Sequence, residues 1–180
     1  MRYAFFCLVA LCLAGCSSAT NQAETANILL TNSFETVSGW LPDDQTATLT
    51  HEQAHSGRTA LKVDDAHEYS LTYSKPLEYF HLTLPVKLRV TAWVLRPSAQ
   101  AYASLVISVT DPAAPSAPAL LWQDIKLNEA GNSYGKWEKV SQVVTLPVGL
   151  QNTHKLSLYL WRTGSGAATY LDDIQVSREP

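Results

Sequence analysis

The sequence predicts an all-β domain built as a two-sheet β-sandwich. Short segments of alternating apolar and polar residues follow one another from Ile28 onward, and Gly, Pro, Asn and Asp interrupt them at frequent intervals. No segment shows a convincing amphipathic helix pattern. Many short strands without helices are typical of a sandwich whose two sheets pack face to face.

Residues 1–15 are predicted to be a secretory signal peptide. Arg2 precedes an apolar run from Ala4 to Leu13, which is about half the length that a membrane-spanning helix needs. The Leu-Ala-Gly-Cys sequence that ends at Cys16 resembles a bacterial lipobox. The resemblance implies cleavage before Cys16, a diacylglycerol on its sulfur and acylation of the new amino group, and two or more acyl chains anchor a protein stably in a membrane. Ser17 at the next position favours the outer membrane by similarity to enterobacterial sorting, in which Asp there suggests the inner membrane.

The mature chain is expected to be a tethered single domain. Residues 16–26 comprise the lipidated cysteine and a small, polar, aperiodic segment that suits a flexible tether, and residues 27–180 form the domain. Of the three cysteines, Cys7 and Cys12 leave with the signal peptide, so no disulfide is available. The domain therefore depends on burial of its own core, for which it is long enough.

The charge balance indicates which classes of ligand the protein can bind. The formal net charge is −3, and charged residues make up only 16% of the chain. A weakly acidic chain argues against nucleic acid as a partner and is compatible with neutral ligands.

The alternating segments are each four to ten residues long and are separated by turn residues. The predicted strands are Ile28–Glu35, Ala47–His51, Ala60–Val63, Tyr69–Tyr73, Lys87–Leu95, Tyr102–Val109, Ala119–Leu127, Trp137–Leu146, Lys155–Trp161 and Thr169–Val176.

The last of these strands contains an acidic residue among apolar ones. The strand period of two places Asp172 on the same face as Ile174 and Val176. If that face meets the core, the carboxylate needs charged or hydrogen-bonding partners, and a bound cation is one such partner. The alternative is that Asp172 and Asp173 only mark a strand that enters from a turn.

Four patches occur in an order and spacing that resemble a known family. They are Asn32–Glu35 before Gly39–Trp40, His55–Gly57 before Ala60–Val63, Trp137–Pro147, and Tyr170–Val176. Together they resemble the family 4 and 9 type of carbohydrate-binding module, a group of galactose-binding-like jelly rolls. The resemblance extends over roughly Ile28 to Ser177, and Ser33 stands where the family pattern usually has Gly.

The resemblance also implies a structural calcium ion where the first and last strands meet. Glu35 and Asp172 would supply carboxylates, and backbone carbonyls near residues 55–57 would complete an oxygen cage. Hard oxygen ligands suit Ca²⁺, which tolerates six to eight of them. The alternative is that Glu35 and Asp172 are solvated or paired with Arg or Lys.

A second motif points to different chemistry. The sequence from His51 to His55 matches H-E-x-x-H, which on a helix holds Zn²⁺ between two histidines with Glu52 as general base. The threonines at 46, 48 and 50 alternate with other residues in a strand pattern, and the apolar stripe of a buried helix is missing. We keep a zinc enzyme as the least favoured alternative, and because no other catalytic arrangement is stronger, we expect no enzymatic activity.

The predicted ligand surface is the outward side of the central strands. Within three of the predicted strands, Leu and Val alternate with an aromatic residue and small hydroxyls, so each strand would present an aromatic ring away from the core. Aromatic rings beside short polar side chains suit the apolar C–H faces and hydroxyls of a sugar. A register error of one residue would instead bury these rings. The expected ligand contacts are Trp93, Tyr102, Tyr159 and Trp161, with Arg89 as a hydrogen-bond donor.

The other tryptophans carry weaker expectations. Trp40 and Trp137 are expected to pack in the core or against loops, and the pattern does not decide the place of Trp122.

These features together predict a non-catalytic carbohydrate-binding lipoprotein of the bacterial cell envelope. Its partners would be a polysaccharide or glycan, the outer membrane through the lipid anchor, and other envelope proteins. The alternative is a structural or adhesion lipoprotein that uses the jelly roll for protein contacts, because a fold does not determine a function.

Overall fold

A computed structural model describes residues 27–36, 48–84, 86–129, 133–164 and 166–179. The predicted signal peptide (1–15), the tether (16–26) with Cys16, and Trp40 lie outside these residues, so those predictions are not addressed by the fold.

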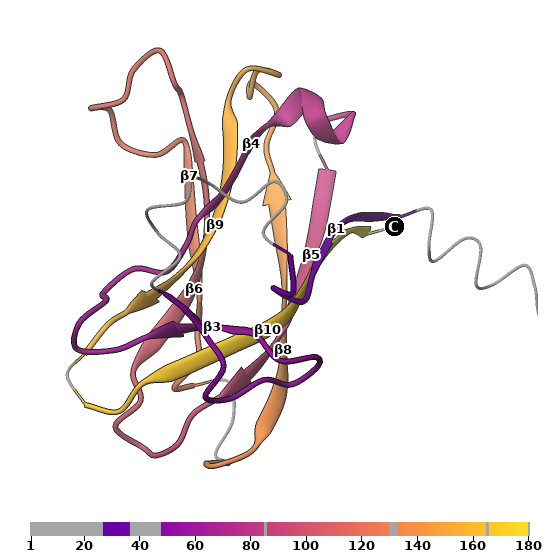
Figure 1. Cartoon of the computed structure of the whole chain (residues 1–180). Coiled ribbons are helices and arrows are strands. Elements are labelled where there is room, and N and C mark those ends of the chain that lie inside the picture. The colour runs from indigo at the N-terminus through magenta and orange to yellow at the C-terminus, as the bar shows by residue number, and fades with distance from the viewer. Residues whose placement is uncertain (1–26, 37–47, 85, 130–132, 165, 180) are drawn as a thin grey trace, which may run out of the picture.

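The described chain is a sandwich of two antiparallel sheets, as predicted (Figure 1). One sheet has six strands in the order β2-β3-β10-β5-β8, with β1 also paired to β10, and the other has the order β4-β9-β6-β7. The elements are β1 Ile28–Asn32, β2 Leu49–Thr50, β3 Ala60–Val63, β4 Tyr73–Pro76, the 3-10 helix η2 Leu77–Phe80, β5 Val86–Leu95, β6 Ala103–Thr110, β7 Leu121–Lys126, β8 Trp137–Leu146, β9 Lys155–Arg162 and β10 Thr169–Glu179.

Most strands match the predicted ranges to within a few residues. β3 and β8 have the predicted bounds, whereas β4 begins at Tyr73 and β10 continues to Glu179. The largest difference is at Tyr69, which forms only an isolated bridge with Trp161 and lies outside β4. Among the described residues, no helix is long and apolar enough to cross a membrane.

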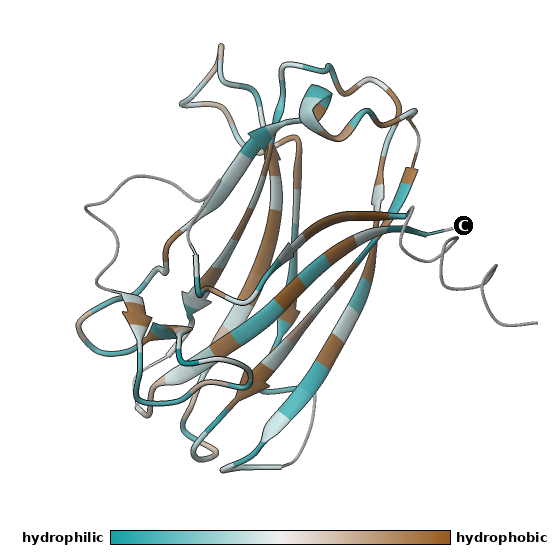
Figure 2. Ribbon diagram, turned by 45° about the vertical axis from the view of Figure 1, so that its right-hand side comes forward, coloured by the Kyte–Doolittle hydropathy of each residue, from teal (hydrophilic) through white to brown (hydrophobic). Residues whose placement is uncertain are grey.

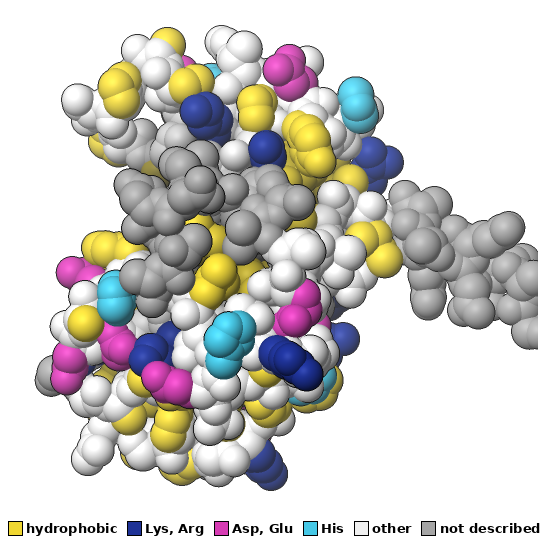
Figure 3. Space-filling view, in the orientation of Figure 1, with side chains coloured by type: hydrophobic (Ala, Val, Ile, Leu, Met, Phe, Trp, Pro, Cys, Tyr) yellow, Lys and Arg dark blue, Asp and Glu magenta, His cyan; other side chains and the backbone are white. Residues whose placement is uncertain are grey.

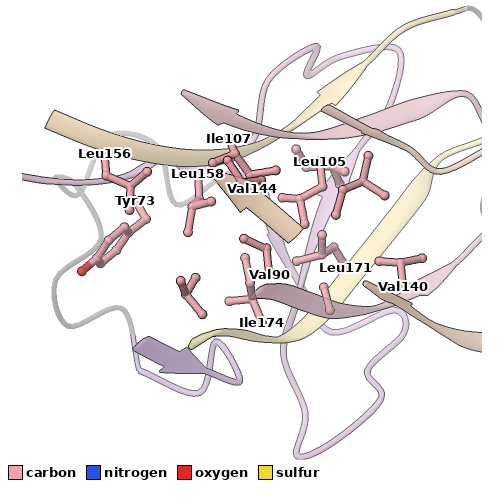
Figure 4. Packing of buried hydrophobic residues seen from close by; sticks show 14 of the residues in the cluster. Tyr73, Val90, Leu105, Ile107, Val140, Val144, Leu156, Leu158, Leu171 and Ile174 are labelled. Atoms are coloured by element: carbon pink, nitrogen blue, oxygen red, sulfur yellow. The ribbon is translucent and has the colours of Figure 1, made fainter. Parts of the chain in front are cut away.

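The core lies between the two sheets and is made by alternate residues of each strand. Figure 2 shows the resulting change between hydrophilic and hydrophobic residues along the strands. Leu158 of β9 and Leu105 of β6 face Leu171 and Ile174 of β10 across the core (Figure 4). All four side chains are at most 1% exposed. Such alternation with one face buried is the pattern that specifies strand register.

β10 organises the six-stranded sheet. One of its edges pairs with β5, while its other edge pairs with β3 near Leu171 and with β1 from Ile174 onward. The first and last strands of the domain therefore meet, and β1 leads directly to Glu35. The loop of residues 51–59, which we call the clamp loop, connects β2 to β3 beside this meeting point.

A β-bulge in β10 corrects the predicted position of Asp172. Asp172 opposes Trp93 of β5, and before the next paired residue β10 has one residue more than β5. The extra residue is at Asp173, whose φ of 45° lies in the left-handed region that Asp tolerates better than most residues. The bulge reverses the alternation, so that Leu171 and Ile174 both face the core. Asp172 therefore does not share a face with Ile174, and that prediction is wrong.

Candidate functional site

The outer face of the β4-β9-β6-β7 sheet carries a continuous aromatic cluster, formed by Tyr69, Tyr159, Trp161 and Trp122. The rings of Tyr69 and Trp161 are nearly parallel, with centroids 6.3 Å apart. The ring of Tyr159 lies 6.1 Å from that of Tyr69, and the ring of Trp122 lies edge to face with that of Trp161 at 6.3 Å. Two of the predicted ligand residues, Tyr159 and Trp161, are thus brought together, on alternate positions of β9.

Tyr69 reaches this cluster because of an irregularity between β4 and β9. Tyr69 opposes Trp161, and Tyr73 opposes Leu158, so the β4 side has one residue more than β9 in this interval. The extra residue places Tyr69 outward, 52% exposed, although Tyr73 is buried in the core. Regular alternation from Tyr73 puts both tyrosines on one face, which is why the sequence did not identify Tyr69.

Trp122 is the second aromatic residue that the prediction missed. It lies on β7 opposite Ser108 and is 48% exposed. Ile125 on the same strand is buried and fixes the inward face. Alternation backward from Ile125 would have assigned Trp122 to the outer face.

A cavity of about 410 Å³ lies at one end of the aromatic cluster. Trp122, Trp161 and the predicted ligand residue Tyr102 line it, together with polar side chains of β6 and β7. Tyr102 is 40% exposed and packs against Gly164, where a Cβ atom would lie only 3.1 Å from the tyrosine side chain. Glycine at 164 therefore leaves room for Tyr102 in its present position.

Short hydroxyl side chains lie on the same face as the aromatic cluster. Ser157 of β9 donates a hydrogen bond from its hydroxyl to the Ser74 hydroxyl at 3.0 Å. Ser108 opposes Ser157 in the neighbouring strand, and Ser104 opposes Trp161. The face therefore combines aromatic rings with small donors and acceptors, which is the chemistry that a sugar ring requires.

Trp93 lies on the other sheet and is separated from the aromatic cluster by the core. It belongs to β5, and the His55 ring stacks on its indole with centroids 3.9 Å apart and an angle of 14°. Trp137 contacts the same imidazole edge to face at 5.7 Å, which fits the loop-packing role expected of it. His55 is held there by a 2.6 Å contact from its Nδ1 to Asp173 Oδ2. One face of Trp93 is thus already covered by this histidine.

Arg89 is also on β5 and is engaged in the surface of its own sheet. Its guanidinium donates two hydrogen bonds to the Glu179 carboxylate on β10 and one to the Ser141 hydroxyl on β8. The predicted ligand residues are therefore split, with Trp93 and Arg89 on one side of the sandwich and Tyr102, Tyr159 and Trp161 on the other.

Asp172 is fully buried because the clamp loop covers it. Its Oδ2 accepts the backbone N–H groups of His55 at 2.8 Å and Ser56 at 3.0 Å, and its Oδ1 accepts the N–H of Asp173 at 2.7 Å. Burial raises the pKa of Asp172 above its ordinary value, while these N–H bonds act in the opposite direction. Hydrogen bonds to backbone N–H groups supply the partners that a buried carboxylate needs.

Glu35 holds the other end of the clamp loop. Its Oε1 accepts the N–H groups of Arg58 at 2.8 Å and Thr59 at 2.7 Å, and these bonds lower the pKa of Glu35. Gly57, between the two held segments, has φ of +60°, and a Cβ atom there would lie 2.5 Å from Glu35 Oε1. A glycine is required at 57 for both reasons.

The carboxylates of Glu35 and Asp172 are the oxygen donors on which the predicted calcium site depends. The backbone bonds to Glu35 use Oε1 and leave Oε2 for another partner, and Asp172 Oδ1 accepts a single N–H. Both are hard carboxylate oxygens beside a loop that can offer carbonyl groups. Among the described residues, no group of three or more His, Cys, Asp or Glu side chains could hold a metal, so backbone oxygens would have to supply most of the ligands.

The H-E-x-x-H motif does not form a zinc site in the described chain. His51 to His55 lie in bends of the clamp loop and not on a helix. His51 contacts the carbonyl of Arg58 through Nδ1, while His55 contacts Asp173 and Trp93. A cavity of about 630 Å³ beside His51 and Glu52 has no Trp, Tyr or Phe among the described residues of its lining. The two histidines point to different partners, so the helical arrangement that this hypothesis needed is absent here.

The fold is similar to that of carbohydrate-binding modules. The CBM22-1 xylan-binding domain from Paenibacillus barcinonensis Xyn10C is 24% identical with a TM-score of 0.54, covering 84% of this chain and 94% of that one. A family 16 carbohydrate-binding module is 15% identical with a TM-score of 0.56, covering 83% and 99%. A CBM22 xylan-binding domain is 11% identical with a TM-score of 0.53, covering 85% and 96%.

These similarities establish the jelly-roll sandwich. The three structures belong to families 22 and 16, whereas the sequence patches resemble the family 4 and 9 type, so the common element is the carbohydrate-binding-module fold. No family model matches the sequence, and no curated protein does so.

The charges on the described surface are mixed in sign. Figure 3 shows basic side chains scattered among acidic ones on the face that it presents, without a basic stripe. A nucleic-acid-binding surface would gather basic residues along one face.

The Glu35 contacts predict a specific pH dependence of stability. The folded pKa of Glu35 is lower than its ordinary value of 4.5, so its stabilisation is complete above pH 4.5 and is lost as the pH falls through the folded pKa. We expect Glu35→Gln to be less stable than the wild type at pH 7, with the difference shrinking toward pH 3. The difference in the free energy of unfolding is measured by urea unfolding in the presence of chelator, at several values between pH 3 and pH 7.

Glu129→Gln is the matched control, because that carboxylate is exposed and forms its ion pair with Lys126 of β7. A stability difference between wild type and Glu35→Gln that does not change with pH would contradict this role of Glu35.

Proposed function

We propose that the protein is a non-catalytic carbohydrate-binding lipoprotein of the bacterial cell envelope. The observation that carries the proposal is the aromatic cluster on the outer face of the β4-β9-β6-β7 sheet, beside short hydroxyls. Similarity of the fold to xylan-binding modules supports a polysaccharide ligand. The family 4 and 9 resemblance supports the same class of ligand.

The residues have distinct roles in this proposal. Trp161 and Tyr159 offer ring faces for stacking, and Tyr69 and Trp122 extend the cluster on both sides. Tyr102 closes the cavity beside Trp122. Trp93 and Arg89 instead stabilise the opposite sheet through His55 and Glu179.

Replacement of Trp161 tests the position of the site. We expect Trp161→Ala to weaken glycan binding by roughly thirtyfold, because removal of a central aromatic contact commonly costs about 2 kcal/mol. A glycan array that includes xylo-oligosaccharides identifies the ligand, and calorimetric titration measures the affinity.

Trp93→Ala is the matched control and should bind within twofold of the wild type. Loss of binding in Trp93→Ala with Trp161→Ala unaffected would place the site on the opposite sheet. A folded wild type that binds no glycan would favour the structural or adhesion alternative, in which the jelly roll makes protein contacts.

We also propose a structural calcium ion held by Glu35, Asp172 and backbone carbonyls of the clamp loop. The ion would join the first and last strands without taking part in ligand chemistry. Calcium at about 100 times its dissociation constant would stabilise the fold by about 2.7 kcal/mol. We expect the melting temperature in calcium to exceed that in chelator by roughly 5–10 °C.

Differential scanning calorimetry measures this shift, with magnesium as the control ion and Glu35→Gln as the variant in which the shift decreases. Equal melting temperatures in calcium and chelator would exclude a calcium ion at this place.

The proposed anchor is tested at Cys16. We expect Cys16→Ala to remain unlipidated and to leave the membrane fraction, whereas Cys12→Ala, within the signal peptide, should still be anchored. Mass spectrometry of the N-terminal peptide and membrane fractionation measure both. Membrane association of Cys16→Ala equal to that of the wild type would contradict lipidation at this residue.

A further inference from the structure

Carboxylates from two different parts of the chain lie at the aromatic cluster, and one of them is in the cavity beside Trp122. Asp124 of β7 lines the cavity, and its Oδ2 accepts a hydrogen bond from the Ser104 hydroxyl at 2.7 Å. Glu68 lies beside Trp161, and its Oε1 accepts the indole N–H at 3.1 Å. This hydrogen bond holds Glu68 against the Trp161 ring of the aromatic cluster.

The basic residues near the cavity are already paired with other acids. Lys126 Nζ lies 3.5 Å from Glu129 Oε1, and Arg162 forms an ion pair with Asp65. Across the part of the chain that the structure describes, no ion pair joins Asp124 or Glu68 to a basic side chain. The described lining of the cavity, with Asp124, Glu129 and Lys126, therefore has one negative charge in excess, and Glu68 beside Trp161 adds a second one at its margin.

The aromatic rings, like the carboxylates, attract positively charged groups. The negative face of an indole or phenol ring attracts a cation that lies within about 6 Å of its centroid. Trp122 and Trp161 meet edge to face with centroids 6.3 Å apart, so a group that stacks on one ring lies close to the other. An anionic sugar such as a uronate would be repelled by Asp124 and Glu68, whereas a protonated amino group would be attracted by both carboxylates and rings.

We propose that the site prefers a glycan that carries protonated amino groups over neutral or anionic glycans. The inference rests on the proposed carbohydrate-binding function and adds the charge class of the ligand. Asp124 and Glu68 are the residues that determine the preference, and Trp161 and Trp122 supply the stacking faces.

The test compares two ligands with the same backbone. A β-1,4-linked glucosamine hexasaccharide and its fully N-acetylated counterpart are titrated calorimetrically at pH 5.5 and 50 mM salt. We expect the wild type to bind the amino form about tenfold more tightly, and this preference to decrease in 500 mM salt because charges on an open surface are screened. The double variant Asp124→Asn with Glu68→Gln should lose the preference and bind the two hexasaccharides with affinities within twofold of each other.

Glu78→Gln is the matched control. It removes one negative charge from an exposed position of the 3-10 helix η2, which follows the opposite end of β4 from Tyr69. The preference should remain about tenfold in this variant.

The outcomes separate the two proposals. Equal binding of both forms by the wild type, or tighter binding of the N-acetylated form, would overturn the charge preference and leave carbohydrate binding intact. An undiminished preference in the double variant would overturn the roles of Asp124 and Glu68. A folded wild type that binds neither hexasaccharide and no glycan on the array would overturn the proposed function, and the charge preference with it.

Discussion

The structure depends on the Asp172 carboxylate, which is fully buried and holds the clamp loop by two backbone N–H groups. A buried carboxylate without partners would be strongly unfavourable, so the loop and the carboxylate require each other. Glu35 secures the far end of the same loop and connects it to the first strand. Because Asp172 lies on β10, which pairs with β1, β3 and β5, these few hydrogen bonds link both ends of the domain to the centre of one sheet.

The clamp loop also determines which side of the sandwich is available to a ligand. It places His55 over Trp93, and Arg89 on the same sheet is occupied by Glu179 and Ser141. The outer face of the β4-β9-β6-β7 sheet has no comparable cover among the residues that the structure describes, and its rings remain partly exposed. The clamp loop and the proposed ligand surface thus lie on opposite sheets.

In the proposed function, the specificity of the aromatic cluster would come from the polar and charged side chains around the rings. Ring faces bind any sugar that offers a suitable apolar surface, so discrimination must come from polar and charged neighbours. Ser104 and Trp161 orient Asp124 and Glu68 by hydrogen bonds, which fixes two negative charges beside the stacking surface. The proposed preference for amino groups depends on these two charges.

The alternation of apolar and polar residues was sufficient to predict the all-β class, most of the strand ranges and the face of the strand on which most residues lie. Leu158 is buried and Trp161 faces outward, as alternation predicted, because one side of each strand must pack in the core. The position of Trp93 and Trp161 on different sheets could be read only from the tertiary structure. Alternation distinguishes core-facing residues from outward-facing ones, but it does not assign a strand to one of the two sheets. The faces on which Asp172 and Tyr69 lie also came from the tertiary structure. One extra residue in a strand reverses the alternation, and the position of that residue depends on pairing with strands distant in sequence.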